Sequence, residues 1–203
     1  TAQSSAAKYE ELGIPYLVDA SDWETDPMAR MEWMKLYSVL YEQEEQVADF
    51  FDEQVKIYED VLEKAASIEN KKNVAWGFLW QGKAAVPYAG SYVGKQLAAV
   101  GADYAFADVG PDLTHTASIT FEEFFAGTVD SDYYISSGPP SYNESTAAII
   151  ERGIPALADM KALKEEGRCW CYEAWYYQEI DRTPEVLREL QAIIYPELYP
   201  DFG

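Results

Sequence analysis

The sequence is poor in several residue types that common functional sites require. Its 203 residues include one histidine and two cysteines. That is too few for a disulfide framework, a cysteine-rich zinc site or a metal site made of two or three imidazoles. Lys and Arg number 15 against 36 Asp and Glu, which gives a formal net charge of −21. Because such a polyanion repels phosphates and anionic lipid headgroups, the composition argues against binding to nucleic acid.

Long hydrophobic runs are also missing. No stretch approaches the roughly 18 consecutive apolar residues of a membrane span, and the first residues do not have the pattern of a signal peptide. The chain starts at Thr1 rather than at methionine, so we expect it to be a piece of a longer protein. Hydrophobic residues nevertheless make up 48% and aromatic residues 15%, which is enough for a folded core and unlike a disordered acidic tail.

The first 70 residues predict three helices and one short strand. Residues 5–12 predict a helix ended by Gly13, and the apolar residues 14–18 predict a strand. Residues 28–41, which follow Pro27, carry large apolar side chains on more than one face and predict a well-buried helix. In residues 44–66 apolar side chains recur every three or four positions. That pattern fits either an amphipathic surface helix or a long strut between two subdomains.

From residue 71 onward the predicted elements alternate between strand and helix. Strands are predicted at 74–80, 132–136 and 168–172, with a loop at 81–90. Ser91 is placed to cap a helix, and Thr120 and Glu123 have the spacing of a capping box. Thr183 is placed to cap the last helix, with Pro184 at its first position. This alternation predicts an α/β fold, a three-layer arrangement whose mainly parallel central sheet is flanked by helices.

Three loops that follow predicted strands are rich in aromatic and small polar residues. In parallel sheets ligands bind at the carboxyl ends of the strands, and aromatic side chains exposed in loops favour a ligand or a second domain. The alternative is that these side chains pack on neighbouring helices. The candidate ligand-binding residues are Trp80, Tyr88, Ser91, Tyr92, Ser137, Trp175 and Tyr176.

Other candidate groups have simpler interpretations. Glu122 and Glu123 are adjacent on a helix and cannot face each other as a catalytic pair, so Glu123 is assigned to the cap and Glu122 to the surface. Cys169 and Cys171 lie on one side of a strand, where a disulfide would be strained, which favours free thiols over a metal site. His115 is either a surface residue or, with Ser91, the base of a hydrolase, although the nucleophile-elbow motif is missing.

In order and spacing, these segments resemble the substrate-binding proteins of ABC importers for iron–siderophore, haem and vitamin B12. In that family two α/β lobes are joined by one long helix. The resemblance covers nearly the whole chain, but most of the family's first lobe has no counterpart in it. The matching stretches are residues 12–19, 27–41, 44–66, 74–101 (including Gly90, Ser91 and Tyr92), 119–136, and 161–171 together with Gln178.

The resemblance implies an organisation. Residues 1–42 would be the last strand and helix of the first lobe, residues 43–70 the connecting helix, and residues 71–203 the second lobe. The protein would be non-enzymatic and extracytoplasmic, either periplasmic or a cell-surface lipoprotein, and monomeric when intact.

The resemblance also implies a function. The protein would hold an iron–siderophore, haem, corrinoid or similar metal chelate between its lobes, without a resident cofactor or metal. It would deliver this ligand to a permease and its ATPase, with Glu122 docking on the permease. A small α/β hydrolase and an acidic protein-interaction module remain the alternatives.

Overall fold

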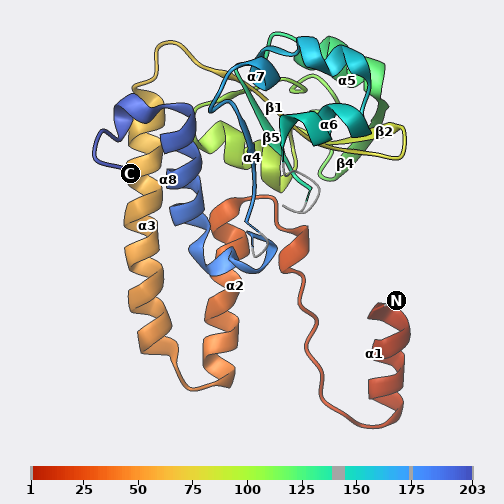
Figure 1. Cartoon of the computed structure of the whole chain (residues 1–203). Coiled ribbons are helices and arrows are strands. Elements are labelled where there is room, and N and C mark those ends of the chain that lie inside the picture. The colour runs from red at the N-terminus through yellow and green to blue at the C-terminus, as the bar shows by residue number, and fades with distance from the viewer. Residues whose placement is uncertain (1, 139–144, 174–175, 203) are drawn as a thin grey trace.

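The computed structural model describes residues 2–138, 145–173 and 176–202. Within them a sheet is surrounded by helices, and a group of longer helices extends away from it (Figure 1). The helices are α1 (Ala2–Glu11), α2 (Pro27–Leu40), α3 (Glu44–Ala66), α4 (Tyr92–Ala99), α5 (Phe121–Thr128), α6 (Thr146–Arg152), α7 (Lys161–Lys164) and α8 (Thr183–Ile194). The strands are β1 (Asn73–Trp80), β2 (Lys83–Pro87), β3 (Asp103–Tyr104), β4 (Thr116–Thr120), β5 (Tyr133–Ser136) and β6 (Cys169–Cys171).

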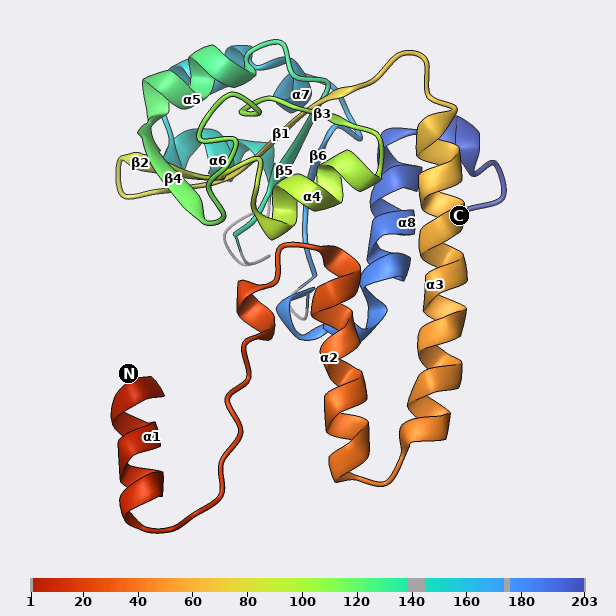
Figure 2. The ribbon, with the colours of Figure 1, turned by 180° about the vertical axis from the view of Figure 1, so that it is seen from behind.

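The sheet has the order β4-β2-β1-β5-β6, and β3 also pairs with β1. Strand β1 is parallel to β3 and β5, and β5 is parallel to β6. Strands β1, β2 and β4 are joined by antiparallel pairing. Helices α5, α6 and α7 lie on one face of the sheet, with α4 and α8 on the other (Figures 1 and 2). The predicted α/β fold with a central sheet flanked by helices is therefore confirmed, and the sheet is mixed, with three parallel and two antiparallel pairings among the described strands.

Strand β1 separates the two halves of the core. Its side chains alternate between faces. A Cβ on Gly77 would lie 3.2 Å from the Phe124 ring of α5, and Leu79 lies close to Gly153 at the end of α6. Trp76 points to the opposite face, where its ring is 5.0 Å from that of Tyr172. Trp76 and Leu79 are each only 1% exposed, so β1 is buried on both sides, as expected for a central strand.

The long helix α3 covers residues that the periodicity assigned to a helix. Its 23 residues span about 34 Å. It lies beside α8 and α2 in both views (Figures 1 and 2). On α8, the buried Gln191 donates to the carbonyl oxygens of Val61 and Val100 at 3.0 and 3.2 Å, which ties α8 to α3 and to the end of α4. Whether α3 connects two lobes stays a prediction.

Three expectations about secondary structure and burial are wrong. Residues 14–18 form no strand, because no other strand of the described chain pairs with them, and Leu17 and Val18 are exposed. Helix α2 is not well buried, since it packs through one side only and leaves Val39 and Leu40 about 60% exposed. Residues 81–90 are not simply a loop. They contain β2, which forms a hairpin with β1 through Gln81 and Gly82, both at positive φ.

Candidate functional site

A cleft of about 430 Å³ opens at the carboxyl end of the parallel strands β1 and β5. It lies between the sheet, the first turn of α4, the start of α2 and the segment that leads into α8. Its walls thus come from parts of the chain more than 150 residues apart. The lining residues are Asp22, Arg30, Trp76, Phe78, Ala85, Pro87, Ser91, Tyr92, Val93, Gln96, Thr114, His115, Thr116, Ser137, Tyr176, Glu179, Ile180, Thr183 and Val186.

The first turn of α4 forms one wall of this cleft. Ser91 caps the helix, as predicted, because its Oγ accepts a hydrogen bond from the amide of Gly94 at 3.3 Å. A Cβ on Gly94 would lie 2.1 Å from the carbonyl oxygen of Ala89. Only glycine therefore allows the preceding loop to pack this closely on the helix. The turn then directs Tyr92 and Val93 into the cleft lining.

Hydrogen bonds join Tyr92 to the segment that leads into α8. The hydroxyls of Tyr92 and Thr183 are 2.9 Å apart. Because the Thr183 hydroxyl donates to the carbonyl of Ile180 at 2.8 Å, it accepts from Tyr92. Burial raises the pKa of Tyr92, which keeps its hydroxyl protonated as the donor. The prediction that Thr183 caps α8 is wrong, because the helix begins at Thr183 itself, with Arg182 as its N-cap residue and no capping hydrogen bond from a side chain.

The opposite wall is aromatic. Tyr172 and Tyr176 stack with their ring centroids 3.6 Å apart, and the Trp76 ring leans on Tyr172. The Tyr176 hydroxyl donates to Oε1 of Gln96 at 2.7 Å, and Gln96 is only 1% exposed. A second hollow of about 230 Å³ lies behind this stack. The aromatic wall and the α4 wall are thus joined through Gln96.

Arg30 of α2 brings a positive charge to the cleft. Its guanidinium lies 4.7 Å from the centre of the Tyr92 ring, and its Nη2 pairs with the exposed Asp22. The arrangement combines a cation–π contact with an ion pair. Helix α2 therefore contributes to the site. The sequence did not indicate this, because α2 is far along the chain from the other walls of the cleft.

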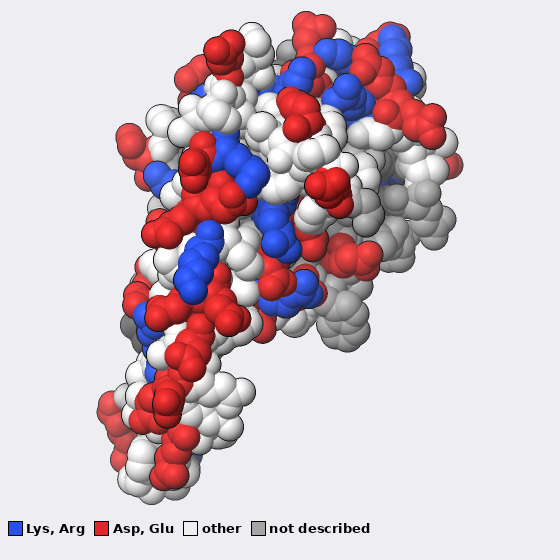
Figure 3. Space-filling model, turned by 90° about the vertical axis from the view of Figure 1, so that its left-hand side faces the viewer, with Lys and Arg blue, Asp and Glu red and all other residues white. Residues whose placement is uncertain are grey.

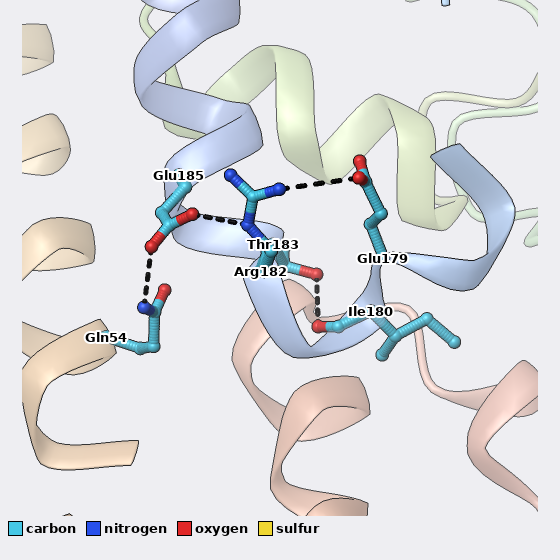
Figure 4. A network of polar contacts seen from close by, with 6 residues as sticks. All are labelled: Gln54, Glu179, Ile180, Arg182, Thr183 and Glu185. Carbon is cyan, nitrogen blue, oxygen red and sulfur yellow. Dashed lines mark hydrogen bonds and ion pairs between the residues drawn. The ribbon is translucent and has the colours of Figure 1, made fainter. Parts of the chain in front are cut away.

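The segment that leads into α8 is held by a second polar network. Arg182 lies between two acids, with Nε 2.6 Å from Glu185 and Nη1 3.4 Å from Glu179 (Figure 4). Glu185 also accepts from Nε2 of Gln54 on α3 at 3.1 Å. Burial acts to raise the pKa of Glu185, but the hydrogen bonds from Arg182 and Gln54 outweigh it and lower the pKa. This network fixes one rim of the cleft to α3.

The structure brings only some of the predicted ligand-binding residues together. Ser91, Tyr92, Ser137 and Tyr176 line the cleft. Trp175 lies outside the described residues.

Trp80 and Tyr88 do not line the cleft. Trp80 is at the end of the β1–β2 hairpin, 41% exposed and stacked on Phe78. Tyr88 packs against the core and lies beside Gly110. These two residues are displaced because residues 83–87 form a strand rather than a loop.

Several cleft residues were not predicted as ligand contacts, among them Arg30, Trp76, Phe78 and Gln96. Trp76 and Phe78 alternate along β1 and so share a face, a signal that could have placed them in the cleft. His115 also lines the cleft, but among the described residues no hydrogen bond joins it to Ser91. The Ser91 hydroxyl instead serves the α4 cap, so the structure gives no support to a hydrolase.

The predicted docking residue lies far from the cleft. Glu122 is exposed in the first turn of α5, on the opposite face of the sheet from α4 (Figure 2). Glu123 completes the predicted capping box, with its Oε2 2.7 Å from the Thr120 amide. This leaves Glu122 free of the cap and on the surface.

The two cysteines have the predicted state. Cys169 and Cys171 are free thiols, and burial raises the pKa of Cys169 to about 12. Within the described ranges no cluster of three or more His, Cys, Asp or Glu could hold a metal ion. The described part of the chain also contains no helix that is long and apolar enough to cross a membrane.

Comparison with known proteins shows which fold this is. No family model matches the chain. An uncharacterized lipoprotein of Methanocaldococcus jannaschii is 31% identical over 197 residues, which are 95% of the chain but 45% of that protein. The chain therefore spans less than half the length of this relative.

Solved structures of similar fold are periplasmic binding proteins. A periplasmic binding protein of Veillonella parvula has a TM-score of 0.74 at 21% identity, with 94% of this chain and 65% of that chain covered. The periplasmic haem-binding protein RhuT of Roseiflexus has a TM-score of 0.72 at 18% identity, with 96% and 72% covered. The haem-binding protein HutB of Vibrio cholerae has a TM-score of 0.68 at 16% identity, with 96% and 73% covered. The chain thus has the fold of the periplasmic solute-binding proteins.

Proposed function

We propose that the chain is the ligand-binding part of an extracytoplasmic solute-binding protein that serves an ABC importer. The cleft at the carboxyl end of β1 and β5 carries the proposal, because it combines a stacked aromatic wall with a few fixed polar groups. Such a composition is typical of small-molecule sites. The periplasmic binding fold and the lipoprotein relative support the same role and an extracytoplasmic location.

The ligand we propose is a metal chelate of the siderophore, haem or corrinoid kind. Within this class, haem presents a broad, largely apolar ring with polar groups at its edge. The walls formed by Phe78, Val93, Tyr176 and Val186 suit such a body, and aromatic faces contribute about 0.5–1.5 kcal/mol per contact beyond the buried area. The named ligands of RhuT and HutB, both haem-binding proteins, support this class.

A permease is the proposed partner, with Glu122 as a docking residue. The side chain is exposed, is free of the α5 cap and lies away from the cleft, so it can meet a basic side chain while the cleft holds ligand. A charge-assisted hydrogen bond to arginine is the physical basis of such docking.

Calorimetric titration with chelates tests the binding proposal. Haemin, cyanocobalamin and a ferric siderophore are titrated into the chain and into its Tyr176→Ala variant. We expect saturable binding of at least one chelate, weakened about tenfold in the variant because the stacked wall is lost. The variant Tyr41→Ala removes an aromatic ring that is 73% exposed at the far end of α2 and serves as the matched control. Absence of binding by every chelate would contradict the proposal.

A further inference from the structure

The indole N–H of Trp76 is a buried donor beside the cleft. Trp76 lines the cleft and is 1% exposed, and its Nε1 has no hydrogen-bond partner among the described residues. Leaving a buried donor unpaired costs about 1–3 kcal/mol. Because Trp76 is part of the cleft lining, a group held in the cleft is the natural source of the missing acceptor.

Arg30 presents a second unpaired donor at the same cleft. It comes from α2, 46 positions before Trp76 in the sequence, and its Nη2 pairs with Asp22. Its Nε is buried and has no hydrogen-bond partner within the described ranges. Because the Arg30 guanidinium lies over the Tyr92 ring, this donor lies next to the wall that α4 forms.

Four acceptors along these walls already receive a hydrogen bond from the chain. Gln96 Oε1 accepts from Tyr176, the Thr183 hydroxyl accepts from Tyr92, and the Ile180 carbonyl accepts from Thr183. The Ser91 Oγ accepts from the α4 backbone. The cleft therefore places two unpaired donors beside acceptors that already have a partner, so an incoming acceptor is the group that would pair with them.

We propose that the ligand carries oxygen acceptors on its edge, as carboxylate or carboxamide groups, that pair with Trp76 Nε1–H and Arg30 Nε–H. The inference rests on the proposed function and specifies the chemistry that the cleft selects. The lining also contains the carboxylates of Asp22 and Glu179, but these are paired with Arg30 and Arg182. A cationic edge group would have no hydrogen-bond acceptor to offer and would leave the Trp76 and Arg30 donors unpaired. Carboxylate and carboxamide share the acceptor oxygen and differ in charge, which separates them experimentally.

Nuclear magnetic resonance of the tryptophan indole groups tests the donor directly. The indole signal of Trp76 is assigned by its loss in Trp76→Phe, and the chain is titrated with sodium acetate, acetamide and methylammonium chloride at matched ionic strength. We expect a saturable shift of this signal with acetate, acetamide or both, and none with methylammonium. A shift with acetate that is lost in Arg30→Gln indicates a carboxylate, and an equal shift with acetamide indicates a carboxamide. A Trp76 signal that neither acetate nor acetamide moves would overturn the inference.

Chelate titration separates this inference from the proposed function. Haemin carries carboxylates and cyanocobalamin carries carboxamides, and each is titrated into the chain and into Trp76→Phe. For a chelate that binds, we expect about tenfold weaker affinity in the variant.

The matched control is Trp170→Phe, because the Trp170 indole already donates to the Gly167 carbonyl at 2.8 Å and does not line this cleft. Equal affinity of the chain and Trp76→Phe for a bound chelate would refute the acceptor pairing while leaving the function intact. Failure of both chelates to bind would count against the function, and the indole titration would still decide the pairing.

Discussion

At the scale of single residues, the close approach of loop and helix at Gly94 sets the shape of the α4 wall. Gly94→Ala places a Cβ 2.1 Å from the Ala89 carbonyl oxygen, and backbone cannot move aside as a flexible side chain can. We expect a loss of about 1–3 kcal/mol in the free energy of unfolding, the range for overpacking. Urea denaturation measures it, with the exposed neighbour Lys95→Ala as control. Equal midpoints for wild type and Gly94→Ala would show that the loop is not held in this position.

Asp132 gives a pH-dependent contribution to stability. It accepts from Lys161 Nζ at 2.7 Å and from the Asn73 amide at 3.0 Å. Burial acts to raise its pKa, but these hydrogen bonds dominate and the folded-state pKa is lowered. The contribution is therefore present above the unfolded pKa of about 3.9 and is lost as the pH falls through the folded value.

The corresponding test compares wild type with Asp132→Asn. We expect the free energy of unfolding of the wild type to fall more steeply below pH 4 than that of the variant. Urea denaturation at a series of pH values between 2 and 7 measures the slopes. Parallel curves would mean that the carboxylate is not paired as described.

The sequence predicted those residues of the site whose position follows from a local signal in the chain. Ser91 and Tyr92 follow from the Gly-Ser cap signal, and Tyr176 follows from its aromatic loop. Arg30 and Trp76 could not be predicted in the same way. Arg30 reaches the cleft only because α2 packs beside α4 and α8. In the sequence Trp76 cannot be distinguished from any other residue of a buried strand, because the position of the cleft at the end of β1 depends on the fold.

At the scale of elements, the capping box of α5 is a local feature that the sequence specifies fully. The Thr120 hydroxyl accepts from the Glu123 amide at 3.1 Å, and the Glu123 carboxylate accepts from the Thr120 amide. We expect Thr120→Ala to lower the free energy of unfolding by about 1 kcal/mol, measured by thermal or urea denaturation. Thr120→Ser, which keeps the hydroxyl, is the control and should cost much less. Equal losses in both variants would argue against the cap.

Gln191 of α8 connects three elements through one buried amide. Its Nε2 donates to Val61 and Val100, and its Oε1 accepts from the Tyr199 hydroxyl. We expect Gln191→Leu to lower the free energy of unfolding by about 1–3 kcal/mol, because the Val100 carbonyl and the Tyr199 hydroxyl lose a buried partner. Denaturation of this variant beside Glu189→Gln, an exposed change on the same helix, measures the difference. A loss no larger than that of the control would show that these contacts add little.

Strand β2, which pairs with β1 and β4, shows where local signals in the sequence fail to predict a strand. The Lys-Ala-Ala-Val-Pro sequence of β2 has low strand propensity apart from Val86. Its pairing with β4 joins residues 29 to 37 positions apart. The prediction that α2 is well buried is wrong for a related reason. Its apolar residues surround the helix, but only the side that faces α3, α4 and α8 has neighbours among the described residues.

At the scale of the whole molecule, the net charge of −21 is spread over helices and loops, and helix α3 alone carries eight Asp and Glu against two Lys. Figure 3 shows acidic side chains along the face that includes α3, and residues such as Glu45, Asp52 and Glu63 are exposed there. Arg30 in the cleft is therefore surrounded by a protein of opposite sign. Exposed charges are screened over about 8 Å at physiological salt. The electrostatic field of the surface acids therefore affects the approach of a ligand more than the contacts of the bound ligand.

The central claim is that the cleft beside α4 binds a metal chelate, and calorimetric titration of Tyr92→Ala against wild type tests it most directly. Tyr92 lines the cleft, supports Arg30 and bonds to Thr183, so its removal changes the cleft on two sides. The account predicts saturable binding of a haem, corrinoid or ferric siderophore to the wild type, at least tenfold weaker binding to Tyr92→Ala, and unchanged binding to Tyr41→Ala. Equal affinity of a chelate for the wild type and Tyr92→Ala, or no binding of any chelate to the wild type, would contradict it.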